Sequence, residues 1–328
     1  MNPKMTTSLQ LKCFTFYHNR DGLNYKLSLM QSWIKLSRPE FHTVGVLPVL
    51  LGAVLGYSAS GIFNLAAVGL ALLATVLIML ATYWSGEVFD YEVDTLSAQM
   101  EKNKFSGGTL VLQQTGIPRD KVFKASIVAI LLAFLIGAYM AWGMGYGTSL
   151  FLVGAAGAFM GFFYSTPPFQ WAYRGIGETF IAIAYGWLPV AVGYYIHTGS
   201  WDLAPILIYG TPIAISIFMV ILINEFPDYP ADKTVGKKNL VVRLGRERAA
   251  VLYIIAALLF LISIIIPIFM GYRAFIFAIP AGILALLNLV DMARGKWRDR
   301  NYLEQLCART IILNTGTTIL LIVGILLT

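Results

Sequence analysis

The chain has 328 residues, of which 58% are hydrophobic and only 12% are charged. A soluble domain carries about 25% charged residues, so the composition excludes an ordinary soluble protein. The formal net charge is +7, but the basic residues form no groove with interleaved aromatic residues, so nucleic acid is not an expected partner.

Seven long segments contain no Asp, Glu, Lys or Arg. These segments are 43–86, 125–173, 179–201, 203–224, 249–272, 274–290 and 310–328. A membrane-spanning helix needs roughly 20 apolar residues, so the first two segments can each supply two spans and the other five can each supply one. We therefore predict an all-α membrane protein with nine transmembrane helices.

The basic residues predict the orientation of these spans. If the spans alternate in direction, 23 of the 24 Lys and Arg residues fall on one side, and only Arg273 falls on the other. The positive-inside rule then places the N-terminus and the large polar loops in the cytoplasm of a multi-pass cell-membrane protein, where the positive charge also faces anionic lipids. Residues 1–38 are predicted to form a cytoplasmic segment with an interfacial helix at 27–36, and residues 39–328 to form the transmembrane domain.

Two acidic motifs share one pattern. Residues 86–94 read Gly-Glu-Val-Phe-Asp-Tyr-Glu-Val-Asp, and residues 224–232 read Asn-Glu-Phe-Pro-Asp-Tyr-Pro-Ala-Asp. The first motif closes the second predicted span and the other closes the sixth, so both emerge on the same side of the membrane. This arrangement indicates two parallel four-helix repeats followed by one further helix.

The acids of each motif recur at positions i, i+3 and i+7, which share one face of a helix. They are Glu87, Asp90 and Asp94 in the first motif and Glu225, Asp228 and Asp232 in the second. Carboxylates this close repel one another unless a cation is bound, and oxygen ligands suit Mg²⁺. We predict that all six bind Mg²⁺ and that the two clusters hold a diphosphate between them. Solvated helix caps are the alternative, which the match between the motifs disfavours. Pro227 and Pro230 predict that the second motif is a loop or a broken turn.

Basic and amide side chains follow each motif and are candidates for substrate binding. They are Asn103, Lys104, Lys233 and Lys237. Cations beside a metal–diphosphate site would neutralise phosphate oxygens and stabilise the leaving group. Alternatively, Lys104 and Lys237 only enforce the membrane topology, which is the interpretation we favour for the basic residues at 246–248 and 294–300.

A third polar feature lies between the motifs. Residues 164–168 read Tyr-Ser-Thr-Pro-Pro and residues 174–178 read Arg-Gly-Ile-Gly-Glu. One interpretation places Arg174 on a phosphate and Tyr164 near an aromatic substrate. The other pairs Arg174 with Glu178 at an i, i+4 spacing, as a modest surface interaction.

These features together resemble the UbiA superfamily of intramembrane prenyltransferases over roughly residues 30 to 328. The resemblance rests on the two acidic motifs, the nine spans, the stretch at 164–178, and Asp-Lys-x-x-Gly-Lys-x-x-Leu at 232–240. Within the superfamily the chain looks most like the 1,4-dihydroxy-2-naphthoate prenyltransferase branch.

The resemblance implies a helical bundle around a central cavity, with Asp90, Asp94, Asp228 and Asp232 as catalytic residues that bind Mg²⁺ and diphosphate. Asn224 keeps the leading Asn of the family motif, whereas Gly86 and Glu87 replace its usual Asn and Asp, which bears on the number of metal ions. The implied reaction transfers a polyprenyl group from an allylic polyprenyl diphosphate to a membrane-soluble aromatic acceptor, as in quinone biosynthesis.

Three alternatives remain at this stage. The acceptor could be a non-quinone or glycerol lipid. The chain could be a cation-coupled transporter, although the acids are predicted at the cytoplasmic ends of helices rather than near the bilayer midplane, where transport sites normally lie. The chain could also be a CDP-alcohol transferase, but the Asp-x-x-Asp-Gly-x-x-Ala-Arg signature of that class is missing from the sequence.

Overall fold

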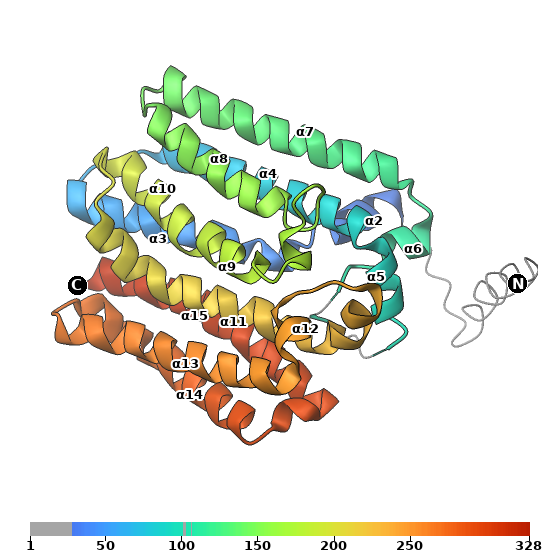
Figure 1. The fold of residues 1–328 in the computed structure, drawn as a ribbon. Helices are drawn as coiled ribbons and strands as arrows, with labels where there is room; N and C mark the ends of the chain where they lie inside the picture. Colours follow the sequence, from blue (N-terminus) through green and yellow to red (C-terminus); the bar gives the residue numbers. More distant parts are fainter. Residues whose placement is uncertain (1–27, 101–102, 106) are drawn as a thin grey trace, which may run out of the picture.

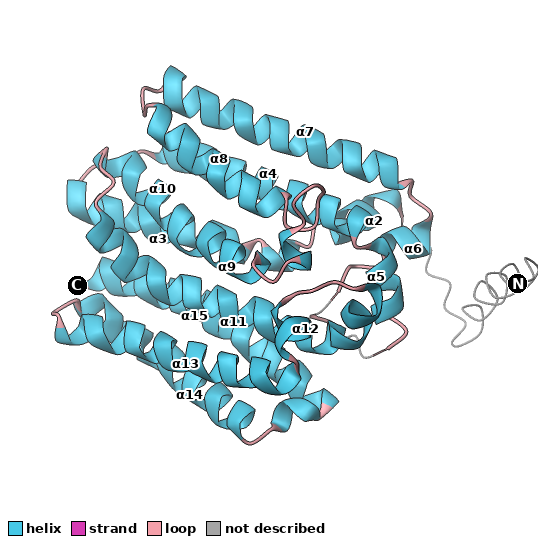
Figure 2. Ribbon diagram, in the orientation of Figure 1, coloured by secondary structure: helices cyan, strands magenta, loops and turns pink. Residues whose placement is uncertain are grey.

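The structure is a computed structural model that describes residues 28–100, 103–105 and 107–328. Every regular element in this part of the chain is helical, and the long helices run side by side as a bundle (Figures 1 and 2). The first half contains α2 (Leu29–Leu36), α3 (Thr43–Ser60), α4 (Leu65–Phe89), α5 (Tyr91–Ser97), α6 (Val111–Thr115), α7 (Arg119–Ala138) and α8 (Thr148–Phe162). The second half contains α9 (Gly177–Ala182), α10 (Leu188–Thr198), α11 (Leu203–Val235), α12 (Leu240–Leu244), α13 (Arg246–Phe269), α14 (Ile279–Ala293) and α15 (Arg300–Leu327).

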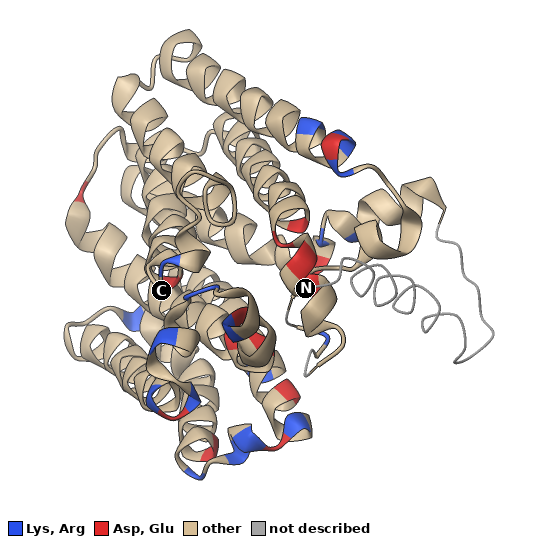
Figure 3. Cartoon of the chain, turned by 45° about the vertical axis from the view of Figure 1, so that its right-hand side comes forward, with Lys and Arg blue, Asp and Glu red and all other residues tan. Residues whose placement is uncertain are grey.

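The nine predicted apolar segments are all helical. Within the described residues, eight helices are long and apolar enough to cross a membrane, one of them being the joined helix Gly177–Thr198 that contains α9 and α10. The ninth, α8, has 15 residues, fewer than the roughly 20 that a span needs. The chain is therefore a multi-pass membrane protein of eight or nine spans. Figure 3 colours the charged residues on the backbone, and most of them lie toward one end of the long helices.

The two halves meet along α3 and α10, which pack closely because glycines face one another. A Cβ atom added at Gly52 would lie 2.1 Å from the carbonyl oxygen of Val190, and one added at Gly193 would lie 2.2 Å from that of Val49. Small residues permit this backbone approach, as is usual between membrane helices. The joint fixes the two halves relative to each other, and α15 packs against both α3 and α11.

The second acidic motif corrects one prediction. α11 continues as a helix through Pro227 and Pro230 instead of breaking into a loop. Pro227 has no N–H for the carbonyl of Ile223, four residues earlier, so that carbonyl loses its usual donor. The buried Cys307 of α15 donates its thiol to this oxygen across 3.7 Å, and this tertiary contact helps the helix to continue. The first motif is the less regular one, because α4 ends at Phe89 and α5 begins two residues later.

The helix predicted at 27–36 is present as α2, although residue 27 lies outside the described residues. Ser28 caps it through a capping box with Gln31, an arrangement that satisfies two N–H groups at the helix start. Leu29, Met30 and Ile34 are exposed while Leu36 is buried against the bundle. Its location at the membrane interface stays a prediction, as does the division of the chain at residue 38.

Candidate active site

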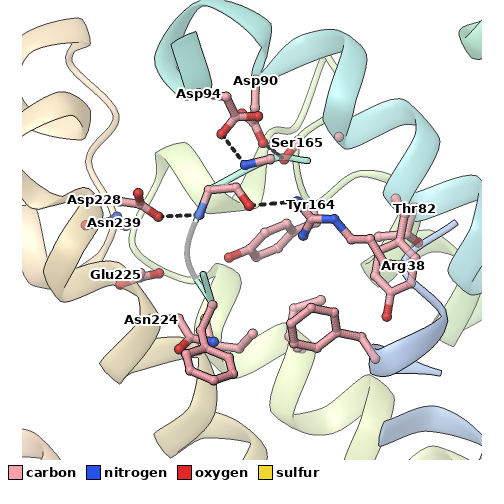
Figure 4. Close-up of a pocket in the computed structure, with 18 of the residues that line it drawn as sticks. Arg38, Thr82, Asp90, Asp94, Tyr164, Ser165, Asn224, Glu225, Asp228 and Asn239 are labelled. Atoms are coloured by element: carbon pink, nitrogen blue, oxygen red, sulfur yellow. Dashed lines mark hydrogen bonds between the residues drawn. The ribbon is translucent and has the colours of Figure 1, made fainter. Parts of the chain in front are cut away.

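Both acidic motifs line one cavity of about 220 Å³ at the end of the bundle where α5 and α12 lie. Figure 4 shows Asp90 and Asp94 on one side of this cavity and Glu225 and Asp228 on the other. The lining includes all six acids predicted as metal ligands, together with Asn224, Tyr164 and Lys237. Away from the acids the cavity is lined by apolar and aromatic side chains, among them Tyr185, Ile217 and Ile221. The site therefore has a charged mouth and an apolar interior.

Lys237 connects the two motifs. Its ammonium nitrogen lies 3.7 Å from Oδ1 of Asp90 and 4.0 Å from Oδ1 of Asp232. Burial lowers the pKa of Lys237, but the two carboxylates outweigh burial and raise that pKa well above its usual value. The side chain consequently stays charged in a largely dry position, where a cation interacts strongly with an anion.

The carboxylates at this end are held by neutral donors as well. Ser165 Oγ and Tyr173 OH donate to the two oxygens of Asp90 at 2.6 and 2.7 Å. Asn239 Nδ2 donates to Asp232 at 2.7 Å. Ser165 and Tyr173 lie in the connection between α8 and α9, and Asn239 lies in that between α11 and α12, so the orientation of each carboxylate is set by the tertiary fold. Burial raises the pKa of the Tyr173 hydroxyl, and the charge of Asp90 raises that pKa further. The hydroxyl therefore keeps its proton and remains a donor.

A loop of the first half crosses the acidic mouth through its backbone. The N–H of Gly107 donates to Asp228 at 2.8 Å, the N–H of Gly108 donates to Asp94 at 2.7 Å, and the N–H of Thr109 donates to Glu87 at 2.7 Å. A Cβ atom at Gly108 would lie 2.1 Å from Asp94 Oδ2. Only glycine can therefore bring the backbone this close without displacing the carboxylate.

Arg38 ties this loop to the first motif. Its Nη2 donates to Glu87 Oε1 at 3.1 Å and to the carbonyl oxygen of Gly107 at 2.7 Å. With Thr109 donating to both oxygens of Glu87, that carboxylate is already held by protein groups. Glu87 thus positions the loop and Arg38, whereas Asp90 faces Lys237.

The pKa of Asp94 is raised far above its ordinary value. Its side chain is buried, and burial raises its pKa to about 8, with the nearby charges of Asp90 and Glu87 acting in the same direction. A buried carboxyl near other carboxylates resists ionisation unless a cation compensates it. The group is consequently partly protonated at neutral pH in the metal-free protein.

The donor set fits a hard divalent cation. Among the described residues no group of three His, Cys, Asp or Glu side chains is close enough to hold a metal ion by itself. Mg²⁺, however, usually binds through one or two carboxylates and takes its other ligands from water and substrate phosphates. The oxygen Asn224 Oδ1 is buried beside the cavity and has no hydrogen-bond partner among the described residues, whereas the Glu225 carboxyl lies beside the buried carboxyl of Glu178. An unpaired buried acceptor such as Asn224 Oδ1 suits a cation that arrives with the substrate.

The other predicted substrate-binding residues lie outside the cavity lining. Lys104 is 68% exposed and pairs with Glu304 at 3.0 Å. Asn103 is buried and contacts Cys307. Lys233 is exposed and donates to the Tyr229 hydroxyl at 3.5 Å. This placement does not support a direct contact between these three side chains and diphosphate.

Arg174 also lies outside the cavity. Its Nη2 donates to the carbonyl oxygen of Pro168 at 3.0 Å, while the buried Glu178 accepts from the N–H of Leu240 at 2.7 Å. Neither interpretation of Arg174 is supported, because Glu178 faces inward to hold the start of α12. Tyr164, in contrast, does line the cavity.

Several site residues were missed by the sequence analysis. They are Arg38, Ser97, Ser165, Tyr173 and Asn239. Ser165 stands inside the stretch 164–168 and Asn239 inside 232–240, so the motifs themselves carried a signal. Ser97, which donates to Asp228 at 2.5 Å, carries none, because it is 131 residues from its partner.

Comparison with known proteins identifies the family. The model of the UbiA prenyltransferase family matches residues 45–315. The chain is 30% identical over 228 residues to the 1,4-dihydroxy-2-naphthoate octaprenyltransferase of Bacillus subtilis, covering 69% of this chain and 70% of that protein. It is 29% identical over 219 residues to the 2-carboxy-1,4-naphthoquinone phytyltransferase of Synechocystis sp., covering 66% of each.

Solved structures share the fold. A UbiA homolog from Aeropyrum pernix superposes with a TM-score of 0.63 at 17% identity, over 87% of this chain and 97% of that one. A UbiA homolog from Archaeoglobus fulgidus, solved with GPP and Mg²⁺ bound, superposes with a TM-score of 0.58 at 19% identity, over 89% of this chain and 99% of that one. The predicted all-helical bundle is thereby confirmed.

Proposed function

Because the chain belongs to the UbiA prenyltransferase family, we propose that it transfers a polyprenyl group from an allylic polyprenyl diphosphate to a naphthoate-type aromatic acceptor, as in menaquinone-type quinone biosynthesis. One observation carries this proposal. Two acidic motifs, 138 residues apart in sequence, line a single cavity whose interior is apolar. The charged diphosphate of such a substrate needs the acidic motifs, and its apolar allylic chain needs the apolar interior beside them.

The acidic mouth is the proposed diphosphate site. Asp90 and Asp94 on one side and Asp228 and Asp232 on the other would hold Mg²⁺, with Glu225 and Asn224 as the nearest additional oxygen ligands. When bound, the ion supplies positive charge that neutralises the diphosphate. The Mg²⁺-bound Archaeoglobus homolog supports this choice of metal.

The cationic side chains of the chain itself are proposed to assist bond cleavage. The C–O bond between the allylic carbon and the diphosphate breaks, and its electron pair leaves with the diphosphate. Lys237, held between Asp90 and Asp232, lies where it can donate to a departing phosphate oxygen. Such a preorganised contact in a dry site lowers the barrier more than the same contact would in water.

The apolar interior is proposed to protect the carbocation. A ring carbon of the acceptor attacks the allylic cation and forms the new C–C bond. That carbon then loses its hydrogen as a proton, or its carboxylate as CO2, and the electron pair of the broken bond returns to the ring and restores aromaticity. Water would intercept the cation, so its exclusion matters. Tyr164 and Tyr185 present aromatic rings to the cavity, and aromatic faces attract cations.

The proposed orientation keeps the acidic mouth and the N-terminus in the cytoplasm. It rests on the distribution of 23 of the 24 basic residues at that side. A water-soluble Mg²⁺–diphosphate product would then leave directly to the cytoplasm, while both lipid-soluble partners reach the cavity from the membrane. The proposed location is the cell membrane.

The test is prenyl transfer by the purified full chain in lipid nanodiscs. Geranylgeranyl diphosphate is supplied with 1,4-dihydroxy-2-naphthoate, with 4-hydroxybenzoate, or with glycerol 1-phosphate, and the products are identified by mass spectrometry. We expect a prenylated naphthalene product that requires Mg²⁺ and is abolished by EDTA. Asp228→Asn serves as the inactive control. Transfer only to glycerol 1-phosphate would contradict the naphthoate assignment, and no diphosphate release with any acceptor would contradict the transferase assignment.

A further inference from the structure

A second cavity lies deeper in the membrane-spanning part of the bundle, between α3, α4, α8 and α10. Its volume is about 110 Å³, and its lining is almost wholly apolar. The one hydroxyl outside Tyr185, that of Thr75, is already donated to the carbonyl oxygen of Ala71 in its own helix at 2.8 Å. The cavity therefore offers almost no polar partner, and a polar ring such as the acceptor has little to bind there.

Two side chains stand where this second cavity adjoins the active-site cavity. Tyr185 lines both cavities and belongs to a buried cluster against which Tyr83, which lines the active-site cavity, packs. Met79 is buried on the second-cavity side, and a Cβ atom at Gly45 would lie 2.6 Å from its sulfur. Methionine is unbranched and adopts several side-chain conformations easily, so the Met79 side chain can move aside between the two cavities.

Three glycines of α8 line the second cavity; a Cβ atom at Gly161 would lie 2.9 Å from Thr82 Oγ1, so Gly154 and Gly157 are the two that keep room open. A Cβ atom at Gly154 would meet nothing within 4 Å, and one at Gly157 would meet only Leu188 Cδ1, at 3.5 Å. These glycines are unlike those at the α3–α10 joint, because no neighbouring backbone requires them. Unfilled apolar space forfeits packing contacts, so the room kept open by Gly154 and Gly157 is explained by an apolar ligand that fills it.

Resting on the proposed function, we propose that the second cavity receives the distal isoprene units of the polyprenyl diphosphate and that Gly154 and Gly157 determine the longest chain that the protein accepts. Met79 lies in α4 and Asp90 directly follows the last residue of that helix. The two residues are eleven positions apart, which places Met79 about 16 Å along the helix from Asp90. A short prenyl group bound at the acidic mouth ends before Met79. A longer chain must pass it.

The experiment compares Gly154→Leu and Gly157→Leu with Gly69→Leu. Gly69 is an exposed glycine of α4 whose added Cβ also meets nothing within 4 Å, and it does not line the second cavity. All three substitutions change helix propensity alike, but only the first two put a side chain into the cavity. Each protein is assayed in nanodiscs with Mg²⁺, acceptor, and either geranyl or geranylgeranyl diphosphate. The rise in Tm caused by each diphosphate is measured in parallel.

We expect the ratio of kcat/KM for geranylgeranyl to kcat/KM for geranyl diphosphate to fall at least tenfold in Gly154→Leu and Gly157→Leu, and to stay within twofold of the natural protein in Gly69→Leu. The rise in Tm with geranylgeranyl diphosphate should shrink in the same two variants. Equal losses with both substrates, or an unchanged ratio, would overturn the chain-length role while leaving the transferase assignment standing. A natural protein that transfers neither chain and whose Tm responds to neither diphosphate would overturn both.

Discussion

Lys237 offers the sharpest test of how the site works. Replacing it with Met keeps most of the side-chain volume and removes the charge between Asp90 and Asp232. If its ammonium stabilises the departing diphosphate, kcat should fall on the order of 10²–10³-fold, the loss typical of one preorganised electrostatic contact. The matched control is Lys104→Met, because Lys104 is 68% exposed and pairs with Glu304 at the surface. An exposed pair contributes about 0–1 kcal/mol, so this variant should keep its activity within about twofold.

Loss of folding must be separated from loss of chemistry. Removing one partner of a buried ion pair destabilises a protein by about 3–5 kcal/mol when the other charge is left uncompensated. Here Ser165 and Tyr173 still hold Asp90, and Asn239 still holds Asp232, so we expect the lower end of this range or less. Adding Asp232→Asn to Lys237→Met should restore the thermal stability, because it removes one stranded charge. It should not restore kcat, because Asp232 is itself a proposed Mg²⁺ ligand, so this variant reports on stability alone.

The assay is steady-state diphosphate release in nanodiscs, with Tm measured on the same samples. Full activity in Lys237→Met would refute the proposed contact between Lys237 and diphosphate. Equal losses in Lys237→Met and Lys104→Met would point instead to the general positive potential of this membrane face. A loss of kcat in Lys237→Met that matches the unfolded fraction given by its Tm would show that Lys237 serves folding alone.

Three further predictions follow from the same contacts. Asp90→Asn and Asp228→Asn should each lower turnover on the order of 10²-fold or more, and the double variant should lose much less than the product of the two, because groups that act as a unit are non-additive; additive losses would separate the two motifs. The pKa of Asp94 is raised to about 8 by burial and by Asp90, so Mg²⁺ affinity measured by calorimetry should increase with pH up to about 8. The metal-free protein should lose stability as the pH rises from 3.8, the ordinary pKa of Asp, toward 8, because the folded state holds a proton that the unfolded state releases. Asp94→Asn should flatten both profiles. Cys307→Val should lower the free energy of unfolding by about 1–3 kcal/mol, because the carbonyl of Ile223 loses its donor, and an unchanged Tm would contradict the role given to the thiol.

The membrane class and most of the helices were determined by the sequence alone. Charge-free segments of adequate length predict spans because the hydrocarbon core excludes charges and requires every backbone hydrogen bond to be made within the segment. The repeated acidic motifs were equally visible, since side chains at i, i+3 and i+7 share one helical face. Their separation by an even number of spans also placed them at one end of the bundle.

Which polar residues meet inside the site was decided only by the tertiary structure. Lys104 and Lys237 each follow an acidic motif in the sequence, yet of these two only Lys237 is brought between the carboxylates. Arg38 reaches Glu87 from a segment that the sequence assigned to the N-terminal region. The physical reason is that local periodicity fixes which face of a helix a residue occupies, whereas contacts across dozens of residues depend on how helices pack. The same holds at Pro227, where the sequence predicted a break in the helix but α11 continues. The proline leaves the carbonyl of Ile223 without its usual N–H donor, and the thiol of Cys307, 84 residues further along the chain, donates to it instead.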